Sequence, residues 1–325
     1  MKERKKMKKN HVLITALFLA VSVAANITGC GKNANVAEVP SNGVQKETAD
    51  AAEGLKYPIE VTDSDGNKVV IESEPETIVS VAPNLTEIIY ELDAQDKLVA
   101  RSDYCDYPSE VSKIDSVGTI FDPDIEKIVS LNPDLVVVST HFNDENSSKL
   151  ESLGITVLTL REPEKFDDVY TIIETMGLAL NRKDRADEVV KKMKSDIENV
   201  KAKVEGSDIP SVYYVVGYGE YGDFTMTGDS YGDGIIEAAG ARNIAKEASG
   251  WMINLETIIE ADPDIIILNE RDFEGFTTAD NYKDLTAVKE GKVYTFNTDT
   301  IDRPGVRNDE AIIELAKICH PEAFE

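Results

Sequence analysis

The side chains of this 325-residue chain that can perform chemistry do not fall into any catalytic spacing. The sequence has no G-x-S-x-G nucleophile motif and no phosphate-binding G-x-x-x-x-G-K-[ST] loop. Residues 217–222 (GYGEYG) follow an apolar segment and have the outline of a dinucleotide-binding fingerprint. Residues 223–228 lack the apolar periodicity of a helix, which such a site needs. We therefore expect neither nucleotide binding nor catalytic residues.

The three histidines do not predict a metal site made of protein ligands. His11 lies in a basic leader, and a site for free zinc or manganese normally needs several histidines with carboxylates. His320 ends a predicted helix, where an imidazole complements the helix C-terminus. His141 follows an apolar strand and points either into a cleft or to the surface.

The charge of the chain excludes one class of partner. Lys and Arg number 34 against 61 Asp and Glu, which gives a net charge of −27. Six of the basic residues lie in the leader at residues 1–29, so the net charge of the chain after the leader is more negative still. Such a chain is repelled by the phosphates of nucleic acid, and we expect no nucleic-acid partner.

Residues 1–29 form a targeting segment. Six basic residues precede an apolar run at 12–25, which is too short to span a membrane and is typical of a secretory signal. The run ends at Ile27-Thr28-Gly29-Cys30, which resembles the lipobox of bacterial lipoproteins. The resemblance implies cleavage before Cys30 and attachment of diacylglycerol and a palmitate-type acyl chain there, with no other cofactor. The alternative is a plain signal peptide with a chance cysteine.

Residues 30–56 are small and polar and read as a flexible tether. Beyond them, Cys105 and Cys319 form either one bridge or two part-buried thiols. We favour two thiols, because two cysteines are not a disulfide framework.

From residue 57 onward, short apolar strands alternate with amphipathic helices, which is typical of a mostly parallel α/β layer. The sequence predicts a hairpin at 57–71, strands at 78–82, 98–100, 135–139, 155–160, 211–216, 265–268 and 292–296, and helices at 85–92, 125–131, 147–153, 232–239, 255–261 and 308–320.

A repeat divides this region into two similar lobes. The helix at 125–131, its following Pro-Asp and the strand from 135 recur 130 positions later, from Leu255 to Leu268, without a gap. We therefore predict an N-terminal α/β lobe at 57–165, connecting helices at 166–206 and a C-terminal α/β lobe at 207–325.

One long helix joins the lobes. Its apolar positions repeat at steps of three and four, Asn181 can cap its start and Gly206 its end, and it spans about 35 Å. The apolar stripe is Ala186, Val190, Met193, Ile197, Val200 and Val204. Two lobes on one stiff joint predict a ligand cleft between them, at the carboxyl ends of the strands.

The chain resembles the substrate-binding proteins of ABC importers for cobalamin and iron–siderophore complexes, the class III family with a helical backbone. The markers are IVSVAPNLTE at 78–87, SDYCDYP at 102–108, the stretch from VGT (117–119) to PDLV (133–136), and AKICHP at 316–321. The resemblance implies two Rossmann-like lobes that move little on binding, and a lipid-anchored monomer on the extracytoplasmic face of the cell membrane.

The resemblance also implies residue roles. Glu126 and Glu256 match the glutamates that dock each lobe onto arginines of the importer's permease subunits; the alternative is that each complements its own helix N-terminus. Ligand contacts are expected from aromatic and polar residues in loops after the strands. The candidates are Asn84, Tyr104, Phe121, Tyr218, Tyr221, Trp251 and Arg303.

Two pairs of residues have open roles. Phe121 and Trp251 occupy equivalent repeat positions and either face each other across the cleft or belong to the lobe cores. Arg303 and Arg307, with Arg161, either meet an acidic chelate or form salt bridges on the surface; we favour the surface for Arg307.

We therefore expect a non-enzymatic binding protein for a metal chelate, either cobalamin or a ferric siderophore. Haem, a membrane-tethered sensor and an enzyme on the same scaffold are the alternatives. An enzyme would need titratable groups with shifted pKa values in the cleft.

Overall fold

The computed structural model describes residues 55–325, so the predicted leader, Cys30 and most of the tether lie outside the described residues. The described chain opens with the predicted hairpin, in which β1 (Ile59–Thr62) pairs antiparallel with β2 (Lys68–Ile71). Asp63 closes the turn, because its Oδ1 accepts hydrogen bonds from the backbone nitrogens of Asp65 and Asn67.

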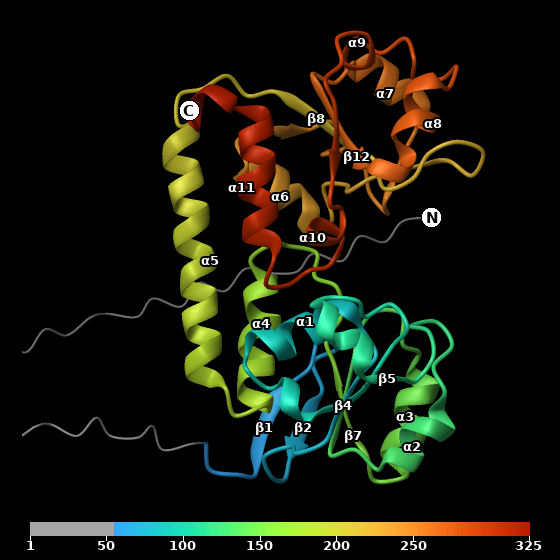
Figure 1. Ribbon diagram of the computed structural model, residues 1–325, viewed down its shortest axis with the longest axis vertical. Coiled ribbons are helices and arrows are strands. Elements are labelled where there is room, and N and C mark those ends of the chain that lie inside the picture. The colour runs from blue at the N-terminus through green and yellow to red at the C-terminus, as the bar shows by residue number, and fades with distance from the viewer. Residues whose placement is uncertain (1–54) are drawn as a thin grey trace, which may run out of the picture. The chain divides into compact units, whose positions relative to one another are not determined.

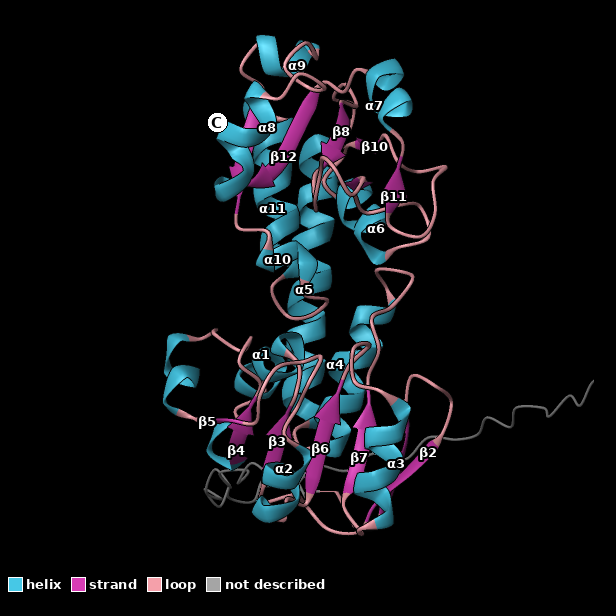
Figure 2. Ribbon diagram, turned by 90° about the vertical axis from the view of Figure 1, so that its right-hand side faces the viewer, coloured by secondary structure: helices cyan, strands magenta, loops and turns pink. Residues whose placement is uncertain are grey.

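The N-terminal lobe is built on a five-stranded parallel sheet in the order β5-β4-β3-β6-β7 (Figure 2). Helices connect successive strands, as parallel pairing requires. The strands are β3 (Ile78–Ser80), β4 (Leu98–Arg101), β5 (Asp115–Ser116), β6 (Leu135–Val138) and β7 (Thr156–Thr159), and the helices are α1 (Pro83–Glu91), α2 (Ile125–Leu131) and α3 (Asp144–Ser152).

The C-terminal lobe is built on a four-stranded parallel sheet in the order β10-β8-β12-β13. A small antiparallel pair, β9 with β11, lies beside it, and β9 begins directly after the glycine-rich 217–222, where no helix was expected. The strands are β8 (Ser211–Tyr214), β9 (Asp223–Phe224), β10 (Arg242–Asn243), β11 (Met252–Ile253), β12 (Ile265–Asn269) and β13 (Val293–Phe296), and the helices are α6 (Tyr231–Ala238), α7 (Leu255–Ala261), α8 (Phe273–Thr278), α9 (Thr286–Lys289), α10 (Asp299–Asp302) and α11 (Asn308–Cys319).

The sequence repeat is a repeat of structure. The order β4-β3-β6-β7 in one lobe corresponds to β10-β8-β12-β13 in the other. Both repeated helices are capped in the same way, since the side chains of Asp124 and Asn254 accept a hydrogen bond from the third residue of α2 and α7. Both helices end in a left-handed residue, Asn132 or Asp262. These matching parts confirm the predicted fold of two parallel α/β lobes.

The repeated Pro-Asp has a structural task in each lobe. Asp134 Oδ2 accepts hydrogen bonds of 2.9 Å from the backbone nitrogens of Glu76 and Thr77, just before β3. Asp264 Oδ2 accepts bonds from the nitrogen and hydroxyl of Ser211, at the start of β8, at 2.8 and 2.6 Å. Each aspartate therefore fastens one central strand to the beginning of its neighbour.

Both sheets are buried on both faces. In β6, Leu135 and Val137 belong to one hydrophobic cluster, and the alternate residues Val136 and Val138 belong to another. In β12, Ile265 and Ile267 join the same cluster as Leu135, although they lie in the other lobe. One continuous core thus extends through both lobes, which matches the near-continuous apolar strands of a parallel sheet.

The helices between the lobes differ from the prediction at one residue. Asn181 does not cap the long helix, which begins one residue after Arg182 and has no side-chain cap. Asn181 instead has a positive φ of 56° and ends α4 (Asp168–Ala179). The nitrogen of Arg182 bonds the carbonyl of Gly177 at 2.7 Å and that of Asn181 bonds Leu178, which is a Schellman motif. The sequence was misread because asparagine suits both a helix start and a left-handed helix end.

The predicted long helix is α5 (Lys183–Val204), whose 22 residues span about 33 Å. Figure 1 shows it running beside both lobes, and it contacts α4 from one and α11 from the other. The predicted apolar stripe is buried from Ala186 to Val200, with Val204 partly exposed at the end. Gly206 follows with a positive φ of 81°.

Three smaller findings complete the fold. Cys105 and Cys319 are free thiols, as expected. The short elements β5, β9, β10, β11, α8, α9 and α10 were not predicted, because two to six residues carry too little periodicity. Within residues 55–325, no helix combines the length and apolarity that a membrane crossing requires.

Candidate functional site

A cavity of about 170 Å³ lies where the two lobes meet, and we call it the interlobe cavity. Its N-terminal wall comes from the loops that follow β3 and β6, at the carboxyl ends of adjacent strands on either side of the point where the strand order reverses. Its C-terminal wall comes from the end of α10. The lining residues are Val81, Ala82, Pro83, Asn84, Ile120, Ser139, Thr140, His141, Phe142, Glu162, Asp302, Arg303 and Pro304.

Asn84 holds the two walls together. It is the second residue of α1, which begins with Pro83, and its side chain is buried at 5% exposure. Its Nδ2 donates a 3.1 Å hydrogen bond to the carbonyl oxygen of Pro304 in the other lobe. The amide oxygen of Asn84 remains available for a ligand at the same position.

Three aromatic rings of the N-terminal lobe gather beside the cavity. Phe121 is 62% exposed and its ring lies 4.9 Å from that of His141, which lines the cavity. Tyr104 meets Phe121 edge to face at 6.2 Å and is 47% exposed. Tyr104 and Phe121, whose ring planes are nearly perpendicular, therefore expose apolar ring surface beside the cavity.

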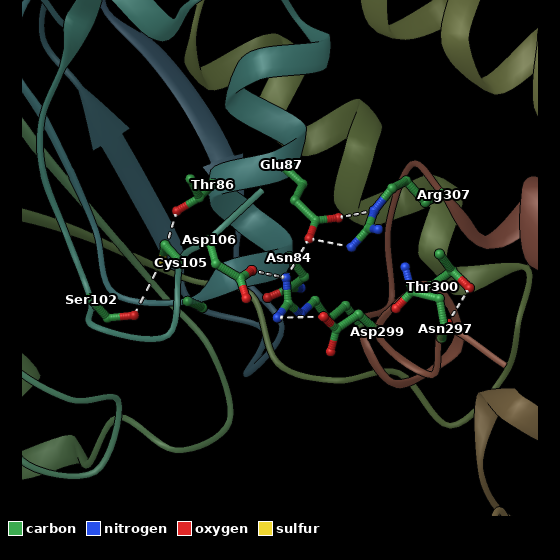
Figure 3. Close-up of polar contacts among 12 residues, drawn as sticks. Asn84, Thr86, Glu87, Ser102, Cys105, Asp106, Asn297, Asp299, Thr300 and Arg307 are labelled. Atoms are coloured by element: carbon green, nitrogen blue, oxygen red, sulfur yellow. Dashed lines mark hydrogen bonds and ion pairs between the residues drawn. The ribbon is translucent and has the colours of Figure 1, made fainter. Parts of the chain in front are cut away.

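An ion cluster with a buried centre, Glu87 and Arg307, lies behind the cavity and joins the lobes. Its other members are Asp106, Asp299 and Arg303. Arg307 Nε and Nη2 donate to the two carboxylate oxygens of Glu87 on α1 at 2.7 and 2.6 Å (Figure 3). The exposures are 6% for Arg307 and 3% for Glu87. Two parallel charge-assisted bonds fix both distance and angle. The cluster thus connects α1 to the C-terminal lobe rigidly.

The favoured surface role of Arg307 is therefore wrong. Arg307 directly precedes α11, and its guanidinium is directed into the interface, where it also lies 4.2 Å over the ring of Tyr107. The sequence does not show this, because Glu87 lies 220 residues away along the chain. Arg161 does make surface ion pairs, with Asp65 and Asp144.

Arg303 lines the cavity, but carboxylates already surround its guanidinium. Its Nη1 donates to Glu87 Oε1 and Asp106 Oδ1, both at 2.8 Å, and Nη2 lies 3.1 Å from Asp299. It is the only Lys or Arg among the cavity-lining residues. The cavity therefore offers a ligand no uncompensated positive charge.

Two acids that sequence reasoning missed also line the cavity, one from each lobe. Burial and the negative charge of Asp302 raise the pKa of Glu162 to about 7. Burial raises the pKa of Asp302 to about 6, although hydrogen bonds from Tyr214 and Thr298 oppose the shift. Glu162 lies two residues after the predicted strand at 155–160, so the rule that ligand residues follow strands could have found it. Asp302 ends a four-residue helix that left no pattern.

The other predicted ligand residues do not line this cavity. Tyr218 packs edge to face on Phe276 and Tyr282 within the C-terminal lobe, and Tyr221 is 86% exposed on the glycine-rich loop. Trp251 is part-buried against the main core, and its backbone nitrogen donates to Thr227 Oγ1 at 3.2 Å. Their role as ligand contacts stays a prediction, as does the pairing of Phe121 with Trp251.

Glu126 and Glu256 occupy matching positions, each the second residue of its repeated helix. Both side chains are exposed, and among residues 55–325 no ion pair engages either. Each lobe thus presents one free carboxylate at a helix N-terminus.

Comparison with known proteins establishes the family. Residues 78–300 match the family described as periplasmic binding protein. The chain is 31% identical to the uncharacterized ABC transporter substrate-binding lipoprotein YvrC of Bacillus subtilis, over 98% of this chain and 100% of that one. It is 27% identical to a cobalamin-binding protein of Halobacterium salinarum, over 84% and 77% of the two chains.

The fold matches solved structures as well. The periplasmic haem-binding protein RhuT of Roseiflexus sp. RS-1 superposes with a TM-score of 0.68 at 21% identity, covering 76% of this chain and 99% of that one. The predicted family is confirmed: the chain belongs to the periplasmic binding proteins, as a solute-binding protein for ABC import and not an enzyme.

Proposed function

We propose that this protein captures a neutral corrinoid of the cobalamin type between its lobes and delivers it to the permease subunits of an ABC importer. The observation that carries the choice of ligand is the charge of the interlobe cavity. Its one cation, Arg303, is already paired with three carboxylates, and its other formal charges are the acids Glu162 and Asp302.

This charge distribution separates the two ligand classes that the sequence left open. A ferric siderophore or ferric citrate with net negative charge needs Arg or Lys groups free to pair with it. In the interlobe cavity such a ligand would have to displace Glu87, Asp106 or Asp299 from Arg303. A neutral corrinoid makes no such demand. The similarity to a cobalamin-binding protein agrees with this choice.

The size of the cavity limits how the ligand enters. A volume of about 170 Å³ is smaller than the 300–1,000 Å³ of ordinary small-molecule sites. A corrinoid would therefore insert one edge between Asn84 and Ser139, and its flat face would lie outside against the ring of Phe121, with Tyr104 beside it. The ion cluster behind the cavity restrains the lobes, so we infer that they rotate little when the ligand binds.

Delivery to the importer would depend on the lipid anchor, the tether and the two exposed glutamates. Cys30 would carry the lipid anchor on the extracytoplasmic face of the membrane, residues 30–56 would tether the binding lobes as a monomer, and Glu126 and Glu256 would dock onto permease arginines. Complementary charges of this kind set encounter rate and register more than affinity.

Isothermal titration of the purified protein with cyanocobalamin, ferric citrate and haem tests the choice of ligand. We expect cyanocobalamin to bind with a Kd of about 1 µM or tighter, and ferric citrate to bind at least about a hundredfold more weakly. Fluorescence of Trp251, the single tryptophan, gives a second readout. Binding of ferric citrate or haem in preference to cyanocobalamin would refute the proposal.

A further inference from the structure

Glu162 and Asp302 face the same cavity from opposite lobes, and we call them the carboxyl dyad. Glu162 lies in the segment after β7, where its backbone nitrogen donates to Thr140 Oγ1 at 2.8 Å. This bond fixes it beside the loop that follows β6. Asp302 is the last residue of α10, where its Oδ1 accepts a 2.7 Å bond from the hydroxyl of Tyr214. The hydroxyl of Tyr214 therefore holds the carboxyl of Asp302 directly, whereas the bond to Thr140 fixes the backbone of Glu162.

The structure gives neither member of the dyad a cationic partner. Every ion pair of the neighbouring Arg303 goes to Glu87, Asp106 or Asp299, and Asp302 and Glu162 take part in no ion pair within residues 55–325. Two acids that face one cavity and have no cation paired with them keep a proton more readily than they ionise together. The other titratable or charged groups around them are His141 after β6, Tyr214 on β8, Tyr231 on α6, and Asp299 and Arg303 beside α10.

We infer that the carboxyl dyad is the specificity-determining element of the site, and that it selects chelates whose edge carries neutral amides over chelates whose edge carries carboxylates. The inference rests on the proposed function and deepens it. A protonated carboxyl donates to an amide oxygen and an ionised one accepts from an amide N–H, so a partly protonated dyad complements a primary amide. A carboxylate in the same place meets like charge and loses a donor.

The shifted acidities agree with this assignment. The pKa values of Glu162 and Asp302, about 7 and about 6, mean that the dyad loses its protons across the neutral range. The more it is ionised, the more strongly it repels a carboxylate ligand. Discrimination should therefore grow as the pH rises from about 6 to about 8.5.

A matched pair of corrinoids tests the inference, because dicyanocobinamide carries amides where dicyanocobyrinic acid carries carboxylates. Titration calorimetry should show that the wild-type protein prefers dicyanocobinamide by at least about tenfold at neutral pH. Glu162→Gln with Asp302→Asn should reduce this preference to near unity and remove its pH dependence. Both substitutions keep side-chain shape, and Asp302→Asn keeps an acceptor oxygen for Tyr214.

The control is Glu164→Gln, which removes one nearby exposed carboxylate that does not line the interlobe cavity. It should leave the preference unchanged. If the double variant keeps the wild-type preference and pH dependence, the dyad does not select the ligand, although corrinoid binding stands. If the wild-type protein binds neither corrinoid, the proposed function itself fails.

Discussion

The two lobes are alike in their scaffold and unlike at the interlobe cavity. Over residues 131–140 and 261–270 the pattern of buried and exposed positions is the same at every residue. Yet the loop after β6 lines the interlobe cavity, whereas the loop after β12 does not. The C-terminal lobe contributes Asp302, Arg303 and Pro304 instead. The scaffold, with the matching positions of Glu126 and Glu256, is therefore repeated in both lobes, whereas the walls of the cavity are not.

The largest effect should follow from breaking the symmetric part of this comparison. Glu126→Lys with Glu256→Lys should reduce corrinoid uptake by cells at least about a hundredfold, because like charges would face the permease arginines. Calorimetric affinity for cyanocobalamin should stay within about twofold, since neither residue lines the cavity. Glu260→Lys, an exposed position on the same helix, is the control. Normal uptake by the double variant would remove the docking role.

The next effect concerns the ion cluster that joins the two unlike walls. Glu87→Ala leaves Arg307 and Arg303 buried without their shared carboxylate, and should lower the free energy of unfolding by about 3–5 kcal/mol. Urea denaturation measures the loss. Glu91→Ala, one turn further along α1, breaks only a half-exposed pair with Arg185 and should cost about 0–1 kcal/mol. Equal losses would contradict the assigned role of the cluster.

A smaller effect sharpens the likeness of the lobes. Asp134→Asn and Asp264→Asn each spoil the bonds that fasten one strand to its neighbour, and should cost a similar 1–3 kcal/mol or so. In Asp134, burial raises the pKa but hydrogen bonds from Glu76 and Thr77 hold it below its usual value. In Asp264, bonds from Ser211 lower the pKa outright.

The pH dependence of this effect has a definite sign. Because the folded pKa values are depressed, each aspartate stabilises the fold at pH above its unfolded pKa of about 3.9, and the contribution is lost as the pH falls through the folded pKa. Thermal melts should therefore show that both variants lose less stability than the wild type below about pH 4. If only one of the two substitutions strongly lowers the free energy of unfolding, the repeated aspartates do not contribute equally to the stability of the two lobes.

The smallest expected effect concerns the aromatic rings that only the N-terminal lobe provides at the cavity. Phe121→Ala should weaken binding of cyanocobalamin by about tenfold, through lost stacking area. Tyr294→Ala, on strand β13 of the other lobe, serves as a control that should leave the affinity unchanged. An unaltered affinity in Phe121→Ala would exclude this surface from the site.

Those features that rest on local chemistry could be predicted from the sequence. The Pro-Asp pairs and the apolar strands act over a few residues, so the repeat and the longer strands of both sheets were predicted with small errors at their ends, whereas the two-residue edge strands β5 and β10 were not predicted. Asn84 and Arg303, which follow predicted strands, do line the interlobe cavity, and their contact with a ligand stays a prediction.

The parts of the site that depend on distant contacts could not be predicted. Glu87 meets Arg307 across 220 residues, and only the packing of α1 on the start of α11 brings them together. For the same reason, the burial of Arg307 and the ion pairs of Arg303 with Glu87 and Asp106 could not be predicted. The position of Asp302 in the cavity could not be predicted either, because it depends on the unpredicted helix α10 and on a hydrogen bond from the hydroxyl of Tyr214.

The central claim is that the interlobe cavity admits the edge of a corrinoid through the N-terminal wall. Titration of cyanocobalamin into a Ser139→Phe variant tests it most directly, because the phenyl ring fills the cavity from the loop after β6. Glu270→Phe, at the position after β12 and exposed outside the cavity, is the matched control. We predict that Ser139→Phe loses detectable binding while its melting temperature is kept and Glu270→Phe binds normally. Unchanged binding by a folded Ser139→Phe protein would contradict the account.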